Sequence, residues 1–176
     1  GAVLFGVPVG VLTAVFLARF CPRGLHKIFR PMVELLAGIP SVVYGFFGLV
    51  VVVPLVRNLF WGSGSSMLTA SILLGMMILP TIITVSESAI RAVPNSYYEG
   101  SLALGATHER SVFFTVVPAA KSGITAGVVL GIGRAIGETM AGLLVAGNQA
   151  RMPPGVSRGL RTLTPHIVLG VDLAAC

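Results

Sequence analysis

Long apolar stretches alternate with short polar ones along most of this chain. Three of the stretches carry no charged residue, and each approaches the roughly 20 apolar residues that a helix needs to cross a bilayer. The third begins with turn-forming glycines and serines, so we place its span after them. The fourth carries Arg134 and Glu138 near its centre. The pattern predicts four membrane-spanning helices, over residues 1–18, 35–56, 66–87 and 122–147.

The composition is that of a membrane protein. Charged residues make up 10% of the chain and apolar residues 55%, with a mean hydropathy of +0.92, whereas about a quarter of the residues in a soluble domain are charged. The net charge of +6 comes from scattered basic residues, without the basic patch typical of nucleic-acid binding. We expect an all-α membrane protein that contacts lipid and binds no nucleic acid. Cys21 and Cys176 belong to no Cys–His cluster, so no metal site is predicted.

The basic residues of the loops predict an orientation in the membrane. Loops 19–30 and 87–121 lie on the same side and hold seven Lys and Arg residues, against four on the other side, at Arg57 and in the tail. Since basic loops favour the cytoplasm, these two loops are expected inside and the loop over residues 148–176 outside. The chain lacks an initial methionine and starts and stops within the apolar pattern, so we expect a fragment of a longer protein.

Small residues recur at helical spacing along the last predicted span. Such stripes let helix backbones approach closely in a membrane, and two of them on one helix predict close packing on more than one side. The first stripe is Gly123, Gly127, Gly131 and Ala135, and the second is Gly133, Gly137 and Ala141.

The loop between the third and fourth spans is the least membrane-like part of the chain. Ser96 and Glu99 match the S-x-x-E capping box at the start of a helix, and Gly105 suits the left-handed residue that ends one. Thr107 is placed to cap a second short helix, which Pro118 is expected to stop. The pattern predicts two short helices joined at a glycine, as either an interfacial linker or an element that docks on a partner.

The segment "EGSLALGATHERSVFFTVVP" resembles the EAA loop of ABC-importer permeases, in which Glu-Ala-Ala is followed at fixed spacing by a glycine and a proline. The matching residues are Glu99, Gly105 and Pro118, while Gly100 and Ser101 stand in place of the two alanines. The resemblance implies that residues 94–118 form a cytoplasmic coupling loop, whose helix sits in a groove of a separate ATPase.

Further blocks are similar to the phosphate importer permeases, and to their PstC type more than to its PstA partner. These blocks are "LAGIPSVVYGFFGL", "ILPTIITVSESAIRAVP", "SLALGA" and "GIGRAIGETMAGLLVAGN". The resemblance implies one MetI-like permease domain over residues 1–176, in the bacterial plasma (inner) membrane, with about four of the six helices of the bundle. It also implies three partners: a PstA-type permease subunit, a cytoplasmic ATPase dimer and an extracytoplasmic phosphate-binding protein. No cofactor is expected in this chain, since the ATPase would bind ATP and Mg²⁺.

Arg134 and Glu138 are four residues apart, so they share a face of a continuous helix. A charge at the membrane centre costs on the order of 3 kcal/mol on insertion scales, and such residues usually face the bundle or a watery path. The planar guanidinium of arginine suits phosphate oxygens. We expect Arg134 to attract phosphate along its path and Glu138 to keep the anion from binding too tightly. The alternative is a structural ion pair that locks the helix.

Other polar residues lie in or beside the spans. Four could line the path, although hydroxyls in helices also bond to carbonyls of their own helix; these are Ser41, Tyr44, Thr81 and Thr84. Glu34 and Glu87 lie at span ends, where solvated or capping roles are expected. The histidines, which are far apart in sequence, are expected to be isolated surface residues: His26, His108 and His166.

The sequence contains no Walker A motif and no hydrolase motif, so we expect a transport subunit and not an enzyme. The predicted function is a permease subunit that forms the path for inorganic phosphate in an ATP-driven importer. Two alternatives stay open. One is an ABC permease for another solute, such as sulfate or molybdate, and the other is an ion-coupled carrier that uses Arg134 and Glu138 as a charge relay.

Overall fold

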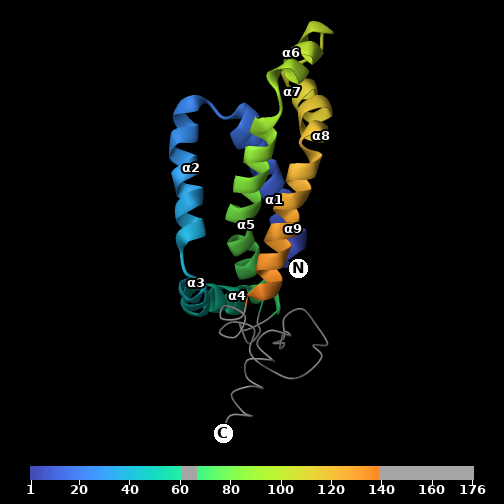
Figure 1. Cartoon of the computed structure of the whole chain (residues 1–176). Helices are drawn as coiled ribbons and strands as arrows, with labels where there is room; N and C mark the ends of the chain where they lie inside the picture. Colours follow the sequence, from blue (N-terminus) through green and yellow to red (C-terminus); the bar gives the residue numbers. More distant parts are fainter. Residues whose placement is uncertain (61–66, 139–176) are drawn as a thin grey trace. The chain divides into compact units, whose positions relative to one another are not determined.

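The computed structural model describes residues 1–60 and 67–138, and these two ranges are helical, without a strand (Figure 1). Five-residue π-helical turns, labelled η, continue three of the α-helices. In chain order the elements are α1 (Ala2–Val15), η1 (Phe16–Phe20), α2 (Arg23–Gly38), α3 (Ser41–Phe47), η2 (Gly48–Val52), α4 (Val53–Phe60), α5 (Met67–Ala92), α6 (Asn95–Ala103), α7 (His108–Ser111), η3 (Val112–Val116), α8 (Val117–Ala119) and α9 (Lys121–Gly137).

Three helices within the described ranges are long and apolar enough to cross a membrane, and they confirm three predicted spans with shifted boundaries. They are Ala2–Phe20, Ser41–Asn58 and Thr69–Ala92. A fourth candidate is a pair of helices, His108–Ala119 and Lys121–Gly137, joined at a 70° bend. The predicted fourth span, residues 122–147, coincides with α9 as far as Gly137, and its remainder lies outside the described residues.

The segment from Arg23 to Gly38 is a helix, so the prediction of a loop over residues 19–30 is wrong. Its apolar residues recur every three or four positions, which is the spacing of an amphipathic helix. The pattern was missed because charged residues occupy the opposite face and interrupt every apolar run. The exposed apolar residues of α2 are Leu25, Ile28, Phe29, Met32, Leu35 and Leu36.

Contacts divide the chain into two units. The first contains Gly1–Phe5, Gly38–Ile78 and Gly133–Cys176. Within it, the buried Tyr44 of α3 packs against the buried Met77 of α5. A Cβ added at Gly75 of α5 would lie 3.6 Å from the carbonyl oxygen of Ala2, so α1 and α5 approach closely here.

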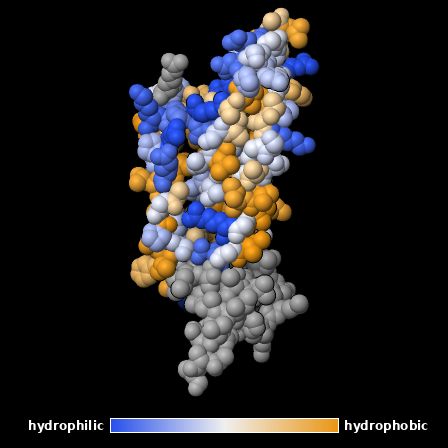
Figure 2. All heavy atoms as spheres, viewed as in Figure 1, coloured by the Kyte–Doolittle hydropathy of each residue, from blue (hydrophilic) through white to orange (hydrophobic). Residues whose placement is uncertain are grey.

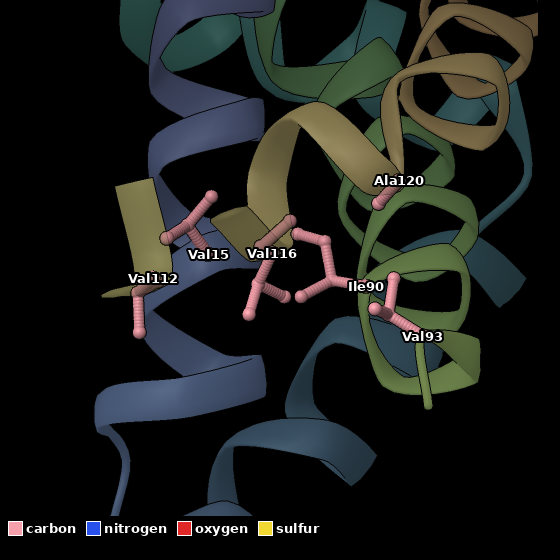
Figure 3. Close-up of a cluster of buried hydrophobic side chains, with 7 residues drawn as sticks. Val15, Ile90, Val93, Val112, Val116 and Ala120 are labelled. Carbon is pink, nitrogen blue, oxygen red and sulfur yellow. The ribbon is translucent and has the colours of Figure 1, made fainter. Parts of the chain in front are cut away.

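The second unit contains Gly6–Ala37 and Leu79–Ile132. Its core joins α1, the end of α5 and η3, which belongs to the predicted coupling loop (Figure 3). The buried members of this core are Ala14, Val15, Ile90, Val93, Val112, Val116 and Ala120. In the same unit α2 runs alongside α5, and α6 and α7 extend beyond the end of α5 (Figure 1). The base of the predicted coupling loop is therefore packed on two membrane helices.

Close packing of α9 on α5 confirms the first small-residue stripe. A Cβ added at Gly123 would overlap the Cβ of Ala89, and one added at Gly127 would lie 3.0 Å from Oγ of Ser86. The second stripe differs, because within the described ranges no atom lies within 4 Å of a Cβ added at Gly133 or Gly137. Close packing of α9 on more than one side is therefore wrong for the described residues, and Ala141 lies outside them.

Apolar side chains cover the visible face of α9, while polar side chains gather along α2 (Figure 2). Val129 and Leu130 of α9 are 66% and 56% exposed. Large exposed apolar side chains on a helix of this kind fit contact with lipid or with another membrane subunit.

Candidate functional site

The predicted coupling loop begins directly after α5. Pro94 is the residue directly before α6. Proline has no backbone N–H, and none is needed at the start of a helix. The helix starts at Asn95, so the capping box of Ser96 and Glu99 is wrong: both residues lie inside the first turns, and within the described chain no side chain caps this helix. Proline at the boundary sets the start of the helix in place of the serine.

Gly105 ends α6 as predicted. Its φ of +83° is in the left-handed region, which costs a residue with a Cβ about 1–2 kcal/mol. The Gly105 amide donates to the Leu102 carbonyl at 2.9 Å, and the Ala106 amide donates to the Ser101 carbonyl at 3.2 Å. This pair of bonds is the Schellman motif. It satisfies two carbonyls at the end of α6 and turns the chain toward α7.

Thr107 caps α7, which confirms that prediction. Its Oγ1 accepts a hydrogen bond from the Arg110 amide. Pro118 does not stop the helix, which ends one residue later, at Ala119. The π-helical turn η3 ends at Val116, two residues before the proline, and Pro118 lies in the first turn of α8, where proline is tolerated. The chain then bends by 70° before α9.

The first part of the coupling-loop motif, Glu99 to Ser101, lies on α6, whereas Gly105 follows that helix and Pro118 lies in α8. Glu99 and Gly100 are exposed, and Ser101 is half-buried, with its hydroxyl donating to the Tyr98 carbonyl at 2.8 Å. Leu104, at the end of α6, is 91% exposed. A large apolar side chain at the tip of a polar loop fits a surface that another protein covers.

Aromatic contacts hold this loop against the end of α1. The Tyr98 hydroxyl and His108 Nδ1 lie 2.8 Å apart, which joins α6 to α7 across the turn at Gly105. The His108 ring also meets the ring of Phe20 edge-on, with centroids 5.0 Å apart. His108 is exposed, as predicted, but it contacts Tyr98 and Phe20, so the prediction that it is isolated is wrong.

Arg134 and Glu138 are both partly buried, and both take part in polar or electrostatic interactions. Arg134 lies in the last turn of α9. The described part of α9 ends at Gly137, and Glu138 follows it as the last described residue, so the predicted shared helical face of Arg134 and Glu138 stays a prediction. Arg134 and Tyr44, two of the predicted path residues, both belong to the first unit, and the charge of Arg134 has an electrostatic effect on the Tyr44 hydroxyl.

The other predicted path residues differ in their surroundings. Ser41 is the first residue of α3 and is partly exposed. Thr81 of α5 is also partly exposed and has a polar interaction. Thr84 Oγ1 donates to the Pro80 carbonyl of its own helix at 2.8 Å, which is the alternative that we considered for such hydroxyls. The predicted outer loop, residues 148–176, and His166 lie outside the described residues.

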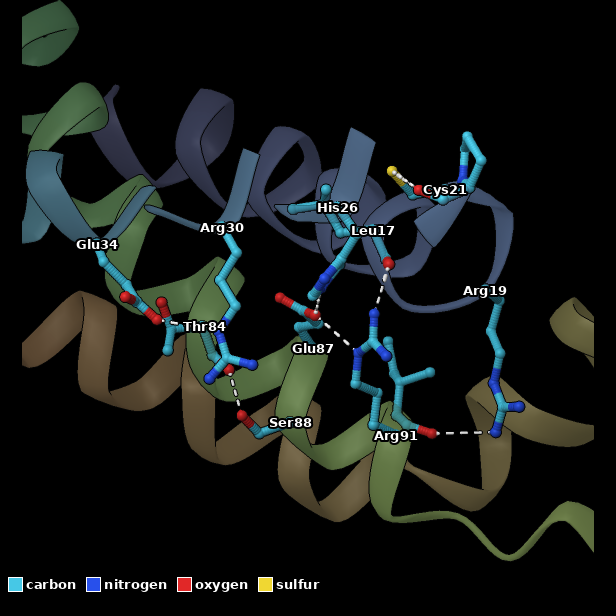
Figure 4. Close-up of polar contacts among 12 residues, drawn as sticks. Leu17, Arg19, Cys21, His26, Arg30, Glu34, Thr84, Glu87, Ser88 and Arg91 are labelled. Atoms are coloured by element: carbon cyan, nitrogen blue, oxygen red, sulfur yellow. Dashed lines mark hydrogen bonds and ion pairs between the residues drawn. The ribbon is translucent and has the colours of Figure 1, made fainter. Parts of the chain in front are cut away.

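A polar cluster that the sequence did not predict lies at the coupling-loop end of α5 (Figure 4). Glu87 is 7% exposed and contacts both His26 and Arg91, so the expected solvated or capping role of Glu87 is wrong. His26 is likewise no isolated surface residue. Glu34 is exposed, in agreement with the expected solvated role, and it also pairs with Arg30 Nε at 3.0 Å, which was not predicted. The four-residue spacing of Glu87 and Arg91 is a sequence signal for their contact, whereas no spacing signals the contact of Glu87 with His26.

Comparison with known proteins agrees with this architecture. Residues 6–175 match the family described as "Binding-protein-dependent transport system inner membrane component". The chain is 42% identical to the "Probable ABC transporter permease protein YqgH" of Bacillus subtilis, with 96% of this chain and 55% of the relative covered. It is 40% identical to the "Phosphate transport system permease protein PstC 2" of Mycobacterium bovis (85% and 52%) and 36% identical to the "Phosphate transport system permease protein PstC" of Mesorhizobium japonicum (94% and 57%). The chain thus spans about half the length of these relatives.

Proposed function

The chain belongs to the family of binding-protein-dependent transport system inner membrane components, and from this premise we propose that it forms the phosphate path of an ATP-driven importer. Two relatives named as phosphate permeases are similar over 85% and 94% of the chain. This similarity is the main support for phosphate as the proposed substrate. The guanidinium of Arg134 supplies donors that suit phosphate oxygens, and its charge influences the Tyr44 hydroxyl of the same unit.

The proposed mechanism is alternating access. A binding protein delivers phosphate from outside, and closure of two ATPase subunits moves the loop over residues 94–118. The bundle then opens inward, and phosphate leaves past Arg134, with Glu138 limiting how tightly the anion is held. A conducting site must release its ion as well as bind it.

Partners complete the importer in this proposal. A PstA-type permease subunit pairs with the chain, a cytoplasmic ATPase dimer binds the exposed α6 and hydrolyses ATP with Mg²⁺, and an extracytoplasmic protein binds phosphate. The Schellman turn at Gly105 and the exposed Leu104 support docking of α6 on the ATPase. Membership of a binding-protein-dependent family leaves the ion-coupled carrier without support, whereas sulfate and molybdate stay as alternative solutes.

The test is ATP-dependent uptake of labelled phosphate into vesicles that carry the full-length parent protein, its partner subunits and the binding protein. Loss of a charge-assisted hydrogen bond costs about 1.5–3 kcal/mol, so Arg134→Ala should reduce uptake by roughly tenfold or more, while Arg134→Lys should retain part of it. Arg57→Ala, at the exposed end of α4, is the control and should leave uptake unchanged.

Three outcomes would change this picture. Normal uptake by Arg134→Ala at normal protein levels would return Arg134 to a structural role. If sulfate or molybdate abolishes phosphate uptake by the wild type, another anion would be favoured as the substrate. Uptake without ATP would remove the ATPase from the mechanism.

A further inference from the structure

Two arginines join the ends of α1 and α5 in the second unit by a reciprocal exchange of hydrogen bonds. Arg91 of α5 donates through Nη2 to the Leu17 carbonyl at 3.0 Å, and Arg19 of η1 donates through Nη2 to the Ile90 carbonyl at 3.3 Å (Figure 4). Each arginine therefore binds a carbonyl in the last turn of the other helix, where the negative end of the helix dipole favours a cation.

Prolines explain why these two carbonyls are available. Ile90 would accept from the amide of residue 94 in a regular α-helix, but residue 94 is proline and has no N–H. Near the end of η1 the Cys21 amide donates to Phe16 at 2.8 Å. In this π-helical register the donor for the Leu17 carbonyl would be residue 22, which is also proline. The sequence thus repeats Arg-x-x-Pro, at residues 19–22 and 91–94, and each arginine satisfies the carbonyl that the other helix's proline leaves without a backbone donor.

Glu87 extends this connection to α2. Its Oε1 accepts from Arg91 Nε at 2.8 Å and from His26 Nε2 at 2.7 Å. The carboxylate is 7% exposed, and a buried charge is tolerated when it is paired and hydrogen-bonded. We name the four side chains Arg19, His26, Glu87 and Arg91 the α5 junction. The junction links α1, α2 and α5 through contacts of 2.7–3.3 Å.

The predicted coupling loop is attached to the same place in two ways. Val93 and Pro94 are the residues between α5 and α6, and Val93 is buried in the core beside Ile90. On the other side of the loop, the His108 ring contacts Phe20, the last residue of η1. The loop, the end of α1 and the end of α5 therefore form a closed set of contacts.

We infer that Glu87 and Arg91 are positioning residues for transport. They hold the base of the coupling loop on α1, α2 and α5, so that a displacement of α6 moves these membrane helices and is not absorbed by rotation at Val93 and Pro94. This inference rests on the proposed function, since it assumes that an ATPase moves α6. It adds a role for residues outside the phosphate path and outside the loop motif.

The test measures ATP hydrolysis and anion uptake together in the reconstituted full-length importer, with Glu87→Gln and Arg91→Lys. Lysine keeps the charge of Arg91 but lacks the planar fork that reaches Glu87 and Leu17 at once. The number of ATP molecules hydrolysed per anion imported should rise about fivefold or more, the low end of the range for energetic coupling between sites. A cavity of about 30 Å³ adjoins Glu87 and Arg91 and has room for water, which should help the variants to fold.

The matched control is Arg30→Gln combined with Glu34→Gln. This pair is also Arg and Glu four residues apart, with a contact of 3.0 Å, and it borders the same cavity. Its side chains are 60% and 55% exposed, and its ion pair lies within α2. The ratio of ATP to imported anion should stay at the wild-type value in this variant.

Two results would overturn the inference. One is a fall in uptake and ATP hydrolysis in equal proportion in the junction variants, which a purely structural role predicts through loss of assembled complex. The other is an equal rise of the ratio in the control. If Glu87→Gln does not assemble, Arg91→Lys and His26→Gln decide the matter. If the wild type imports sulfate or molybdate and not phosphate, the proposed substrate fails, and the ratio is measured with the anion that is imported.

Discussion

Arg91 and Arg134 both lie in the last turn of a membrane helix, yet their surroundings differ. Arg91 has a carboxylate at 2.8 Å and a backbone carbonyl at 3.0 Å, so its donors are committed to holding helices together. Arg134 is partly buried and acts on the Tyr44 hydroxyl. In the sequence each is a single basic residue of a predicted span or its end. Glu87 is four positions from Arg91, but Leu17 and Tyr44 come from segments more than 70 positions away from Arg91 and Arg134, and spacing alone does not identify them.

Gly105 carries a prediction at the residue scale. Gly105→Ala should destabilise the turn between α6 and α7 by about 1–2 kcal/mol, because alanine is strained at a φ of +83°. Within the described ranges no atom lies within 4 Å of an added Cβ, so the effect comes from the backbone. Hydrogen exchange of the Ala106 amide, which is bonded to Ser101, should quicken by roughly 5–30-fold. Gly105→Asn is the control, since asparagine tolerates this conformation better, and equal exchange in both variants would contradict the explanation.

Packing of α9 on α5 shows what small residues do at the scale of elements. The stripe of Gly123 and Gly127 brings the two helix backbones close together, and Ile90 and Val116 fill the core beside them. The second stripe has the same sequence spacing but open space around Gly133 and Gly137. Helical spacing therefore predicts that a close contact is possible, and the position of the neighbouring helix decides which stripe is used.

A pair of substitutions tests this packing. Gly123→Ala should destabilise the full-length protein by about 1–3 kcal/mol, because the new methyl group overlaps the Cβ of Ala89. Gly133→Ala should leave stability unchanged or raise it by up to about 1 kcal/mol, since alanine restricts the unfolded chain and meets no neighbour within the described ranges. Thermal unfolding in detergent measures both. Equal destabilisation of the two variants would mean that Gly133 faces a partner as closely as Gly123 faces α5.

The helix α2 illustrates a limit at the same scale. Span prediction from charge-free runs divides this segment between a loop and a span, although residues 23–38 form one helix. Its charged residues lie along α5, where His26 contacts Glu87 and Arg30 borders the cavity beside Arg91. Because charged residues on one face of an amphipathic helix interrupt its apolar runs, a search for charge-free runs does not detect such a helix.

At the scale of the whole molecule, the orientation in the membrane is a prediction from loop charges. In a cysteine-free full-length parent, cysteine placed at the exposed Asn58 should react with an impermeant maleimide from outside the cell, and cysteine placed at the exposed Ser96 should react only from the cytoplasmic side. The measurement compares right-side-out with inverted vesicles. Labelling after permeabilisation is the control for reactivity, and reaction of both positions from one side would contradict the predicted topology.

The proposed activity also belongs to the whole assembly. This chain covers about half of each related permease, and the proposal brings the path, the ATPase and the binding protein together only in the complete importer. In the proposed assembly, coupling would depend on how firmly the loop over residues 94–118 is attached to the membrane helices. The contacts of the α5 junction and of Phe20 with His108 supply that attachment in the second unit.

Local chemistry in the sequence was enough to predict the membrane class, three of the spans, the left-handed turn at Gly105 and the cap at Thr107. Each depends on residues a few positions apart, and backbone sterics and burial of apolar runs act at that range. The tertiary structure decided that α2 is a helix that packs against α5 and that Glu87 is buried between His26 and Arg91. It also decided that Arg19 donates to the Ile90 carbonyl while Arg91 donates to the Leu17 carbonyl. These contacts join residues 61–74 positions apart. They form because desolvated charges and carbonyls without donors must find partners, and the packing of distant helices determines which partners are within reach.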